Sequence, residues 1–292
     1  MRGVGEATGA ITIVNALPTG VGAAVGIELR ARAEVELHPA GSRGRWDVRL
    51  PPDARTPLVI ASLDTALNRF APGSAGTASA SIRSEIPPAR GLKSSSAVSS
   101  AVILAVAAAT DSSPPPLEVA RLSASSAKAS GVSATGALDD ALAGLSRGVV
   151  VTDNRSGTLL ASYDLPGGLA VALLVPHATH RPSPEWSAAF ARFGERGRSA
   201  VGSAQSGDWA TAMRLNTEIV EQVVGYEYRE VRAELERRGA VGASVSGMGP
   251  ALAAIAPATR LAGVLDAMPA RVGEPRTVLL SRNRAAPNGG RS

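Results

Sequence analysis

The chain has 292 residues, 45% of them hydrophobic, and is long enough to bury one large core or two moderate ones. It contains no cysteine, which excludes disulfide bridges and thiolate metal sites and agrees with a cytoplasmic location. The net charge of +5 comes from scattered arginines, and with only three each of Phe, Tyr and Trp the chain lacks aromatic platforms for nucleic-acid bases.

The first third of the chain alternates apolar with small or polar residues, as β-strands do. Residues 1–20 lack the basic segment, long apolar core and cleavage site of a secretory signal, and we interpret them as the first strand. The alternation continues over 23–39, 45–51 and 77–87, whereas 56–70 carries apolar residues at helical spacing. We therefore expect a β-rich region with one helix.

The middle of the chain is expected to be mainly helical. Residues 96–110 carry no charge, which predicts a helix buried on all sides; the run is too short and too rich in Ala and Ser for a membrane span. A second helix within 112–130 begins with prolines and ends before Gly131, and a third follows the glycine-containing turn at 131–137. Residues 149–165 then have the pattern of a β-hairpin.

A second domain is expected to begin near Pro166 with a strand over 169–176. Two or three helices should follow, and then a glycine-rich turn, a closing helix and a closing strand. Two of these helices are predicted over 209–225 and 228–239. The closing helix is predicted over 260–271 and the closing strand over 276–281. The predicted division is an N-terminal domain over 1–165, a C-terminal domain over 166–283 and a disordered tail over 284–292.

The run PPARGLKSSSAVSSA, residues 87–101, lies between a predicted strand and the buried helix. A helix N-terminus exposes unpaired N–H groups and partial positive charge, so a phosphate bound there is stabilised. Gly91 would let a phosphate approach the main chain, Lys93 adds charge, and the serines at 94–96 add hydroxyl donors and a possible Mg²⁺ ligand. It is not a Walker A loop, because Leu92 precedes the lysine. The alternative is an ordinary loop and helix cap.

Two further stretches suggest the same kind of site. Asp139 and Asp140 follow a glycine-containing turn, where one carboxylate could face a substrate hydroxyl or a metal, the alternative being helix capping. The Gly-rich turn at 246–250 lies between a strand end and an apolar run, and could also be a plain hairpin loop. We interpret His177 and His180, which lack metal-ligand spacing, as loop or substrate-rim residues, and Ser125-x-x-Lys128 as a chance match to the penicillin-recognising motif.

Together the three stretches resemble the motifs of the galactokinase, homoserine kinase, mevalonate kinase and phosphomevalonate kinase superfamily, the GHMP kinases. The matching residues are Pro88, Gly91, Leu92 and Ser94 to Ser96, then Thr135 to Ala141 with one extra residue, and Ser246 to Gly249. Nearly the whole chain is similar to the archaeal-type shikimate kinases, through TIVNALPTGVGAAVGIEL, IPPARGLKSSSAVSSA, TGALDDALAG running on to VVVTDN, and SGMGP. The segment AGLSRG departs from that pattern, where relatives carry an aromatic residue and a Gly-Gly pair.

This resemblance implies an α/β (α+β) protein with the two-domain GHMP kinase fold. The N-terminal domain would be an α/β domain of the ribosomal protein S5 domain 2-like type, the C-terminal domain a ferredoxin-like α+β domain, with the site between them. The implied reaction is phosphorylation of shikimate by ATP with Mg²⁺, giving 3-phosphoshikimate on the route to chorismate and aromatic amino acids. Homoserine kinase or another GHMP small-molecule kinase is one alternative, and a non-catalytic ligand-binding regulator another. The resemblance also allows a homodimer.

The resemblance also implies roles for particular residues. Asp139 matches the catalytic aspartate, which either accepts the hydroxyl proton or holds the hydroxyl in place. The ATP phosphates are assigned to Pro88, Ala89, Arg90, Gly91, Leu92, Lys93, Ser94, Ser95, Ser96 and Ala97, and Mg²⁺ to Ser95 and Ser96. The acceptor is assigned to Asn15, Thr19, Ser133, Thr135, Asp140, Ser246, Gly247 and Gly249. Its carboxylate is expected to bind Arg181 or Arg282.

Overall fold

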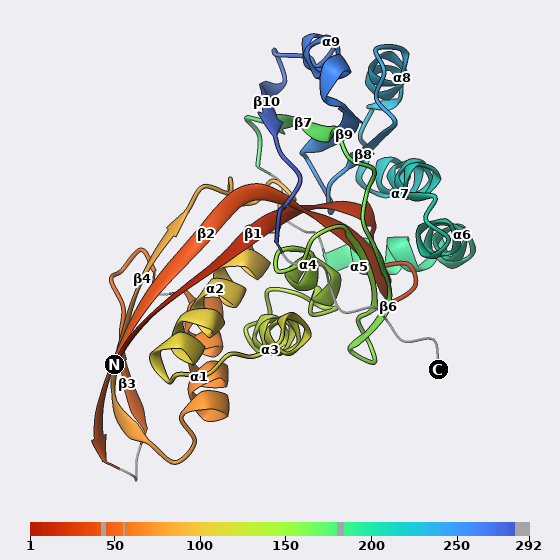
Figure 1. The fold of residues 1–292 in the computed structure, drawn as a ribbon. Helices are drawn as coiled ribbons and strands as arrows, with labels where there is room; N and C mark the ends of the chain where they lie inside the picture. The colour runs from red at the N-terminus through yellow and green to blue at the C-terminus, as the bar shows by residue number, and fades with distance from the viewer. Residues whose placement is uncertain (42–44, 55, 180–183, 284–292) are drawn as a thin grey trace.

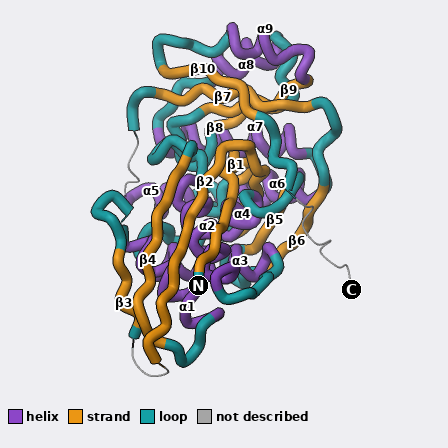
Figure 2. Tube along the Cα trace, turned by 60° about the vertical axis from the view of Figure 1, so that its left-hand side comes forward, coloured by secondary structure: helices purple, strands orange, loops and turns teal. Residues whose placement is uncertain are grey.

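The long strand β2, Val21–Gly41, organises the N-terminal part of the molecule. The computed structural model describes residues 1–41, 45–54, 56–179 and 184–283. Strand β2 pairs with β1 over most of its length, with β4 through its second half and with β5 through its first five residues (Figure 2). The sheet order is β3-β4-β2-β5-β6, with β1 also on β2. The other strands are β1 Arg2–Val14, β3 Trp46–Arg49, β4 Ala75–Ser84, β5 Val149–Asp153 and β6 Thr158–Tyr163.

Helices cover one face of this sheet (Figure 1). They are α1 Pro57–Phe70, α2 Ser94–Ala109, α3 Pro116–Ala129 and the short α4 Leu138–Ala143. Helix α2 packs directly on β1 and β2, and α1, α2 and α3 also pack against one another. Most of its side chains are buried, which confirms the prediction from its lack of charge. The close approach depends on small residues, because a Cβ on Gly5 of β1 would lie 2.2 Å from the backbone oxygen of Ala101.

A second, antiparallel sheet has the order β10-β7-β9-β8 and is formed entirely after residue 166. Its strands are β7 Leu169–Pro176, β8 Gly242–Val245, β9 Leu252–Pro257 and β10 Gly273–Val278. The helices of this part are α5 Pro184–Ala191, α6 Gly194–Gln205, α7 Trp209–Val224, α8 Arg229–Arg237, the one-turn η1 Ala258–Arg260 and α9 Leu261–Asp266. The described residues between β7 and β8 thus contain four helices where two or three were predicted, because both α5 and α6 precede the helix that was predicted to begin at residue 209. None of the described helices has both the length and the hydropathy that a membrane span requires.

The two sheets are joined by buried hydrogen bonds around Thr12, near the end of β1. The Ser244 hydroxyl donates to the Thr12 carbonyl over 2.9 Å, and the Gly247 N–H donates to the Thr12 hydroxyl over 2.8 Å. The Ser246 hydroxyl accepts from the Thr12 N–H and donates to the Gly91 carbonyl over 2.7 Å. Three segments that lie far apart in sequence are therefore held at one point between the sheets.

The predicted boundary at residues 165 and 166 falls between β6 and β7. The chain crosses back once more near its end, where Leu280 forms a bridge with Ile27 of β2. The closing strand predicted over 276–281 has the expected length but lies three residues earlier, as β10 spans Gly273–Val278. The predicted tail over 284–292 lies outside the described residues.

We predict that Gly5→Ala destabilises the protein by about 2–3 kcal/mol, because the added methyl group would overlap the backbone of α2 and force the helix away from the sheet. Urea unfolding followed by circular dichroism measures this change. Gly202→Ala is the matched control: it lies in α6 with no atom within 4 Å of the added Cβ, and alanine favours a helix. Equal stability of the two variants would show that the packing of α2 on β1 is not tight.

Candidate functional site

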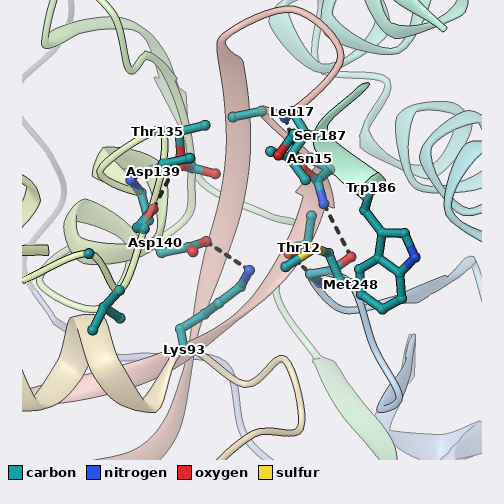
Figure 3. A pocket seen from close by; sticks show the side chains of 17 residues that line it. Thr12, Asn15, Leu17, Lys93, Thr135, Asp139, Asp140, Trp186, Ser187 and Met248 are labelled. Atoms are coloured by element: carbon teal, nitrogen blue, oxygen red, sulfur yellow. Dashed lines mark hydrogen bonds and ion pairs between the residues drawn. The ribbon is translucent and has the colours of Figure 1, made fainter. Parts of the chain in front are cut away.

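A pocket of about 570 Å³ lies between the two parts of the molecule, beside the joint at Thr12 (Figure 3). The end of β1, the first turn of α4, the loop before α2, helix α5 and the turn between β8 and β9 all contribute to its walls. Its polar and charged lining residues are Thr12, Asn15, Lys93, Ser133, Thr135, Asp139, Asp140 and Ser187, and its larger apolar ones are Leu17, Trp186 and Met248. All three motifs singled out in the sequence therefore meet at one cavity.

The serine-rich loop lines an adjoining pocket of about 400 Å³. Its hydroxyl-bearing residues Ser94, Ser95 and Ser96 face this pocket at the start of α2, together with Ala89, Gly91, Leu92 and Lys93. Lys93 precedes the helix in a left-handed backbone conformation, with φ 65°, and forms no side-chain cap. The ordinary helix cap that was the alternative interpretation of this run is therefore not present at this position.

Three residues assigned to this loop do not line its pocket. Pro88 is exposed, and Ala97 is buried in the core. Arg90 donates from Nε to the Pro176 carbonyl over 2.7 Å and from Nη2 to the His177 carbonyl over 2.8 Å. Its guanidinium thus ties the loop to the end of β7 instead of extending into the pocket.

Gly91 is needed for a contact that the sequence did not reveal. Its φ is 81°, and a Cβ there would lie 2.0 Å from the backbone oxygen of Ser246. The space was expected to serve a phosphate, but it is the Ser246–Gly249 turn that packs against this glycine. The missing side chain therefore brings the two glycine-bearing loops together.

Asp139 is the most enclosed carboxyl group of the site, with 4% of the residue exposed. Its Oδ1 accepts a hydrogen bond of 2.8 Å from Asn154 Nδ2, and Asn154 Oδ1 accepts one of 2.7 Å from the Thr152 hydroxyl. On the other side, a Cβ on Gly22 of β2 would lie 2.3 Å from Asp139 Oδ2. Asn154 and Gly22 thus restrict the orientation of the carboxyl group, and sequence reasoning had identified neither.

The surroundings of Asp139 make it a weak acid. Burial raises the pKa of Asp139 to about 7, and the neighbouring charge of Asp140 acts in the same direction. The positive charge of Lys93 and the hydrogen bond from Asn154 lower the pKa and limit the rise. A carboxyl group with this pKa can take up or release a proton near neutral pH.

Asp140 forms an ion pair with Lys93, with Lys93 Nζ 3.0 Å from Asp140 Oδ1 (Figure 3). Both side chains are largely enclosed, with 11% and 13% exposed, respectively. The two carboxylates therefore have different partners, Asp139 an amide and Asp140 an ammonium group. Lys93 brings positive charge from the serine loop to the acidic side of the pocket.

The remaining predicted residues are placed unevenly. Asn15, Ser133, Thr135 and Gly247 line the central pocket, and Gly249 lines the serine-loop pocket. The Thr19 hydroxyl bonds to Val21, and the fully buried Ser246 links the loops, so neither side chain lines the central pocket.

Two arginines, Arg181 and Arg282, were expected at the acceptor carboxylate. The main chain of Arg282 bonds to Glu28, and Arg282 is absent from the lining of the central pocket, so that expectation is wrong for Arg282. Arg181 and His180 lie outside the described residues, and within the described part of the chain no three His, Asp or Glu residues gather as a metal site would require.

Comparisons with known proteins agree with the motifs. Residues 58–148 match the model of the GHMP kinases N terminal domain. The chain is 34% identical to a shikimate kinase of Pyrococcus abyssi over 88% of this chain and 92% of that protein. It is 37% identical to one of Thermococcus kodakarensis, over 86% and 90%, and 34% identical to one of Methanosarcina mazei, over 98% and 96%.

Solved structures show the same fold at low sequence identity. The mevalonate kinase of Methanococcus jannaschii is similar with a TM-score of 0.71 at 12% identity, covering 97% of this chain and 99% of that one. A homoserine kinase from Cytophaga hutchinsonii has a TM-score of 0.68 at 16% identity, covering 98% and 96%. The α/β (α+β) GHMP kinase fold expected from the motifs is thereby confirmed. With its three motifs gathered at one cavity and relatives that match it nearly from end to end, the chain belongs to the GHMP kinases and, within them, to the archaeal-type shikimate kinase family.

Proposed function

We propose that this kinase transfers the terminal phosphoryl group of ATP to the 3-hydroxyl group of shikimate, giving 3-phosphoshikimate on the route to chorismate and aromatic amino acids. The observation that carries the proposal is a buried carboxyl group, Asp139, in the same cavity as the serine loop of a chain that matches shikimate kinases over 86–98% of its length. Phosphoryl transfer depends mainly on positioning and on neutralising charge. A cytoplasmic location and a homodimer remain predictions.

The donor phosphates would lie on the serine loop. The N-terminal turn of α2 supplies N–H groups and partial positive charge there. The pocket residues also fit Mg²⁺, because no hydrogen bond from the Ser95 or Ser96 hydroxyl is formed within the described part of the chain and the carboxylate of Asp140 lies at the shared edge of the two pockets. When bound, Mg²⁺ would neutralise phosphate charge, with Ser95 or Ser96 as the protein ligand.

Asp139 would act on the acceptor hydroxyl. Its raised pKa suits a group that accepts a proton as the hydroxyl oxygen attacks phosphorus. Asn154 and Gly22 keep the carboxyl group in one orientation, and Lys93 offsets the negative charge of Asp140 next to the incoming phosphates. In this scheme the chain holds the hydroxyl between Asp139 and the serine loop.

The two alternatives are less well supported. A change of acceptor to homoserine has only the shared fold in its favour, since the homoserine kinase structure is 16% identical. A non-catalytic regulator would not need a carboxyl group buried beside an anion-binding loop. Both alternatives are tested by the same experiment as the leading proposal.

We predict ATP-dependent turnover of shikimate in a coupled ADP-release assay, and turnover at least about 100-fold lower with homoserine, mevalonate and galactose, because the site must pair the polar groups of its own acceptor.

Asp139→Asn is the matched variant: it keeps the shape of the side chain but cannot accept the proton, so turnover should be lost while titration with an ATP analogue still shows binding. Turnover only with homoserine would contradict the acceptor, no turnover with any of the four would favour the regulator, and an active Asp139→Asn would show that the proton acceptor is misassigned.

We predict that Asn154→Ala moves the acid limb of the pH profile of kcat/KM to higher pH. The Asn154 hydrogen bond lowers the pKa of Asp139, so its loss raises that pKa and leaves less carboxylate at a given acidic pH. Thr152→Val should act in the same direction more weakly, because it removes the hydroxyl that orients Asn154. Asn68→Ala, on the exposed face of α1, is the control. An unchanged acid limb in Asn154→Ala would argue that Asp139 does not set it.

We predict that Gly22→Ala lowers kcat by about 100-fold while ATP binding is retained, because the new methyl group displaces the Asp139 carboxyl group from its position. Steady-state kinetics and analogue titration measure the two effects separately. Gly202→Ala again serves as the control for a glycine with open space. A kcat within about threefold of the control would mean that Asp139 tolerates another orientation.

A further inference from the structure

The distribution of lysine in this chain points to a second charged site. The sequence contains 28 arginines but only two lysines, Lys93 and Lys128. Lys93 lines the central pocket, and Lys128 of α3 lines a smaller pocket of about 180 Å³. Apart from histidines, the basic side chains elsewhere in the described part of the chain are arginines, and each of the two lysines lines one of two adjoining pockets.

The smaller pocket continues the central one on the side away from the serine loop. It shares Ala16, Leu17, Ala134 and Thr135 with the central pocket, and it shares no lining residue with the serine-loop pocket. The central pocket shares Lys93 and Asp140 with the serine-loop pocket. The three cavities therefore form a series, with Asp139 in the middle and the donor phosphates at the opposite end from Lys128.

Two cations line the smaller pocket, Lys128 and Arg155. Neither forms an ion pair with a carboxylate of the described residues, although many other arginines of the protein do. The aliphatic part of the Lys128 side chain lies against Gly136, so that a Cβ added to Gly136 would lie 2.7 Å from Lys128 Cε. The Arg155 side chain lies against Gly20 in the same way, and a Cβ added to Gly20 would lie 2.5 Å from Arg155 Nε. Both cations thus lie against turns that form the pocket.

Asn154 connects this pair to Asp139. Its side chain donates to Asp139, and Lys128 Nζ donates to its carbonyl group over 3.5 Å. Arg155 is the next residue in the chain. Asn154 therefore lies between Asp139, the proposed proton acceptor, and the two cations. A small ligand can contact Asp139, Lys128 and Arg155 together.

We propose that Lys128 and Arg155 bind the carboxylate of the acceptor, while its hydroxyl group points toward Asp139. This inference rests on the proposed function and assigns the acceptor subsite that Arg282 does not supply. A carboxylate bound by two cations gains charge-assisted hydrogen bonds, and partial exposure keeps the desolvation cost of the cations low. The ring would lie against Ala16, Leu17 and Ala134, with Ser133 and Thr135 available to further hydroxyl groups. Anionic acceptors are selected over neutral sugars by this arrangement.

The test compares Lys128→Met, Arg155→Met and the double variant in steady-state kinetics with shikimate and with its methyl ester. Methionine keeps an apolar stem and removes the charge. We expect KM for shikimate to rise about 10-fold in each single variant and about 100-fold or more in the double variant, with kcat and the KM for ATP within about threefold. The neutral ester should be a poor substrate of the unaltered enzyme and should change little in the variants. Arg83→Met, an exposed arginine on β4, is the control for loss of charge alone.

Two results would overturn the subsite: an unchanged KM for shikimate in the double variant, or an equal loss with the ester. A second measurement separates failure of the subsite from failure of the proposed function. Calorimetric titration with cyclohex-1-enecarboxylate, which has no hydroxyl group to phosphorylate, should show binding to the unaltered protein and none to the double variant. If the unaltered protein binds this carboxylate but does not turn over shikimate, the proposed function fails and the subsite stands. If the unaltered protein turns over shikimate but the double variant still binds the carboxylate, the subsite fails and the proposed function stands.

Discussion

The site depends on one set of buried hydrogen bonds, in which Thr12 and Ser246 join β1, the serine loop and the turn between β8 and β9. Buried polar groups are stable only when they are paired, so these bonds strongly favour one relative arrangement of the three segments. Gly91 allows the contact because it has no side chain between the two loops. Each segment carries one motif, and the joint brings the motifs within reach of a single ligand.

Around this joint, charge is arranged in a sequence that suits phosphoryl transfer. The helix N-terminus and Lys93 lie at one end, the two carboxyl groups in the middle, and Lys128 and Arg155 at the other end. Asp139 and Asp140 are adjacent in the chain yet differ, because burial makes Asp139 a weak acid despite its hydrogen bond from Asn154, while Asp140 has an ammonium partner at 3.0 Å. Two neighbouring carboxyl groups can therefore have separate tasks.

Much of the fold could be predicted from patterns within short stretches. Alternation predicted the long strands, the lack of charge over 96–110 predicted the buried helix α2, and the motifs predicted the family. The predictions failed where a side chain's partner lies far along the chain. Arg90 was assigned to phosphate but ties its loop to β7, and the number of helices before β8 was too low. Lys128 was not singled out as a binding residue, because nothing near it in sequence marks the pocket that it lines.

Short stretches of the sequence were enough to indicate the anion-binding loop, the candidate aspartates and the superfamily. Each of these depends on residues within about ten positions of one another and on the backbone geometry that such a stretch adopts. Folding added the partners that give these residues their properties. Gly22 and Asn154 contact Asp139 from two different strands or strand ends, and Lys128 of α3 reaches the Asn154 carbonyl just after β5 only in the folded chain. Burial, and with it the pKa of Asp139, arises when those distant segments exclude water, which no local pattern of residues can record.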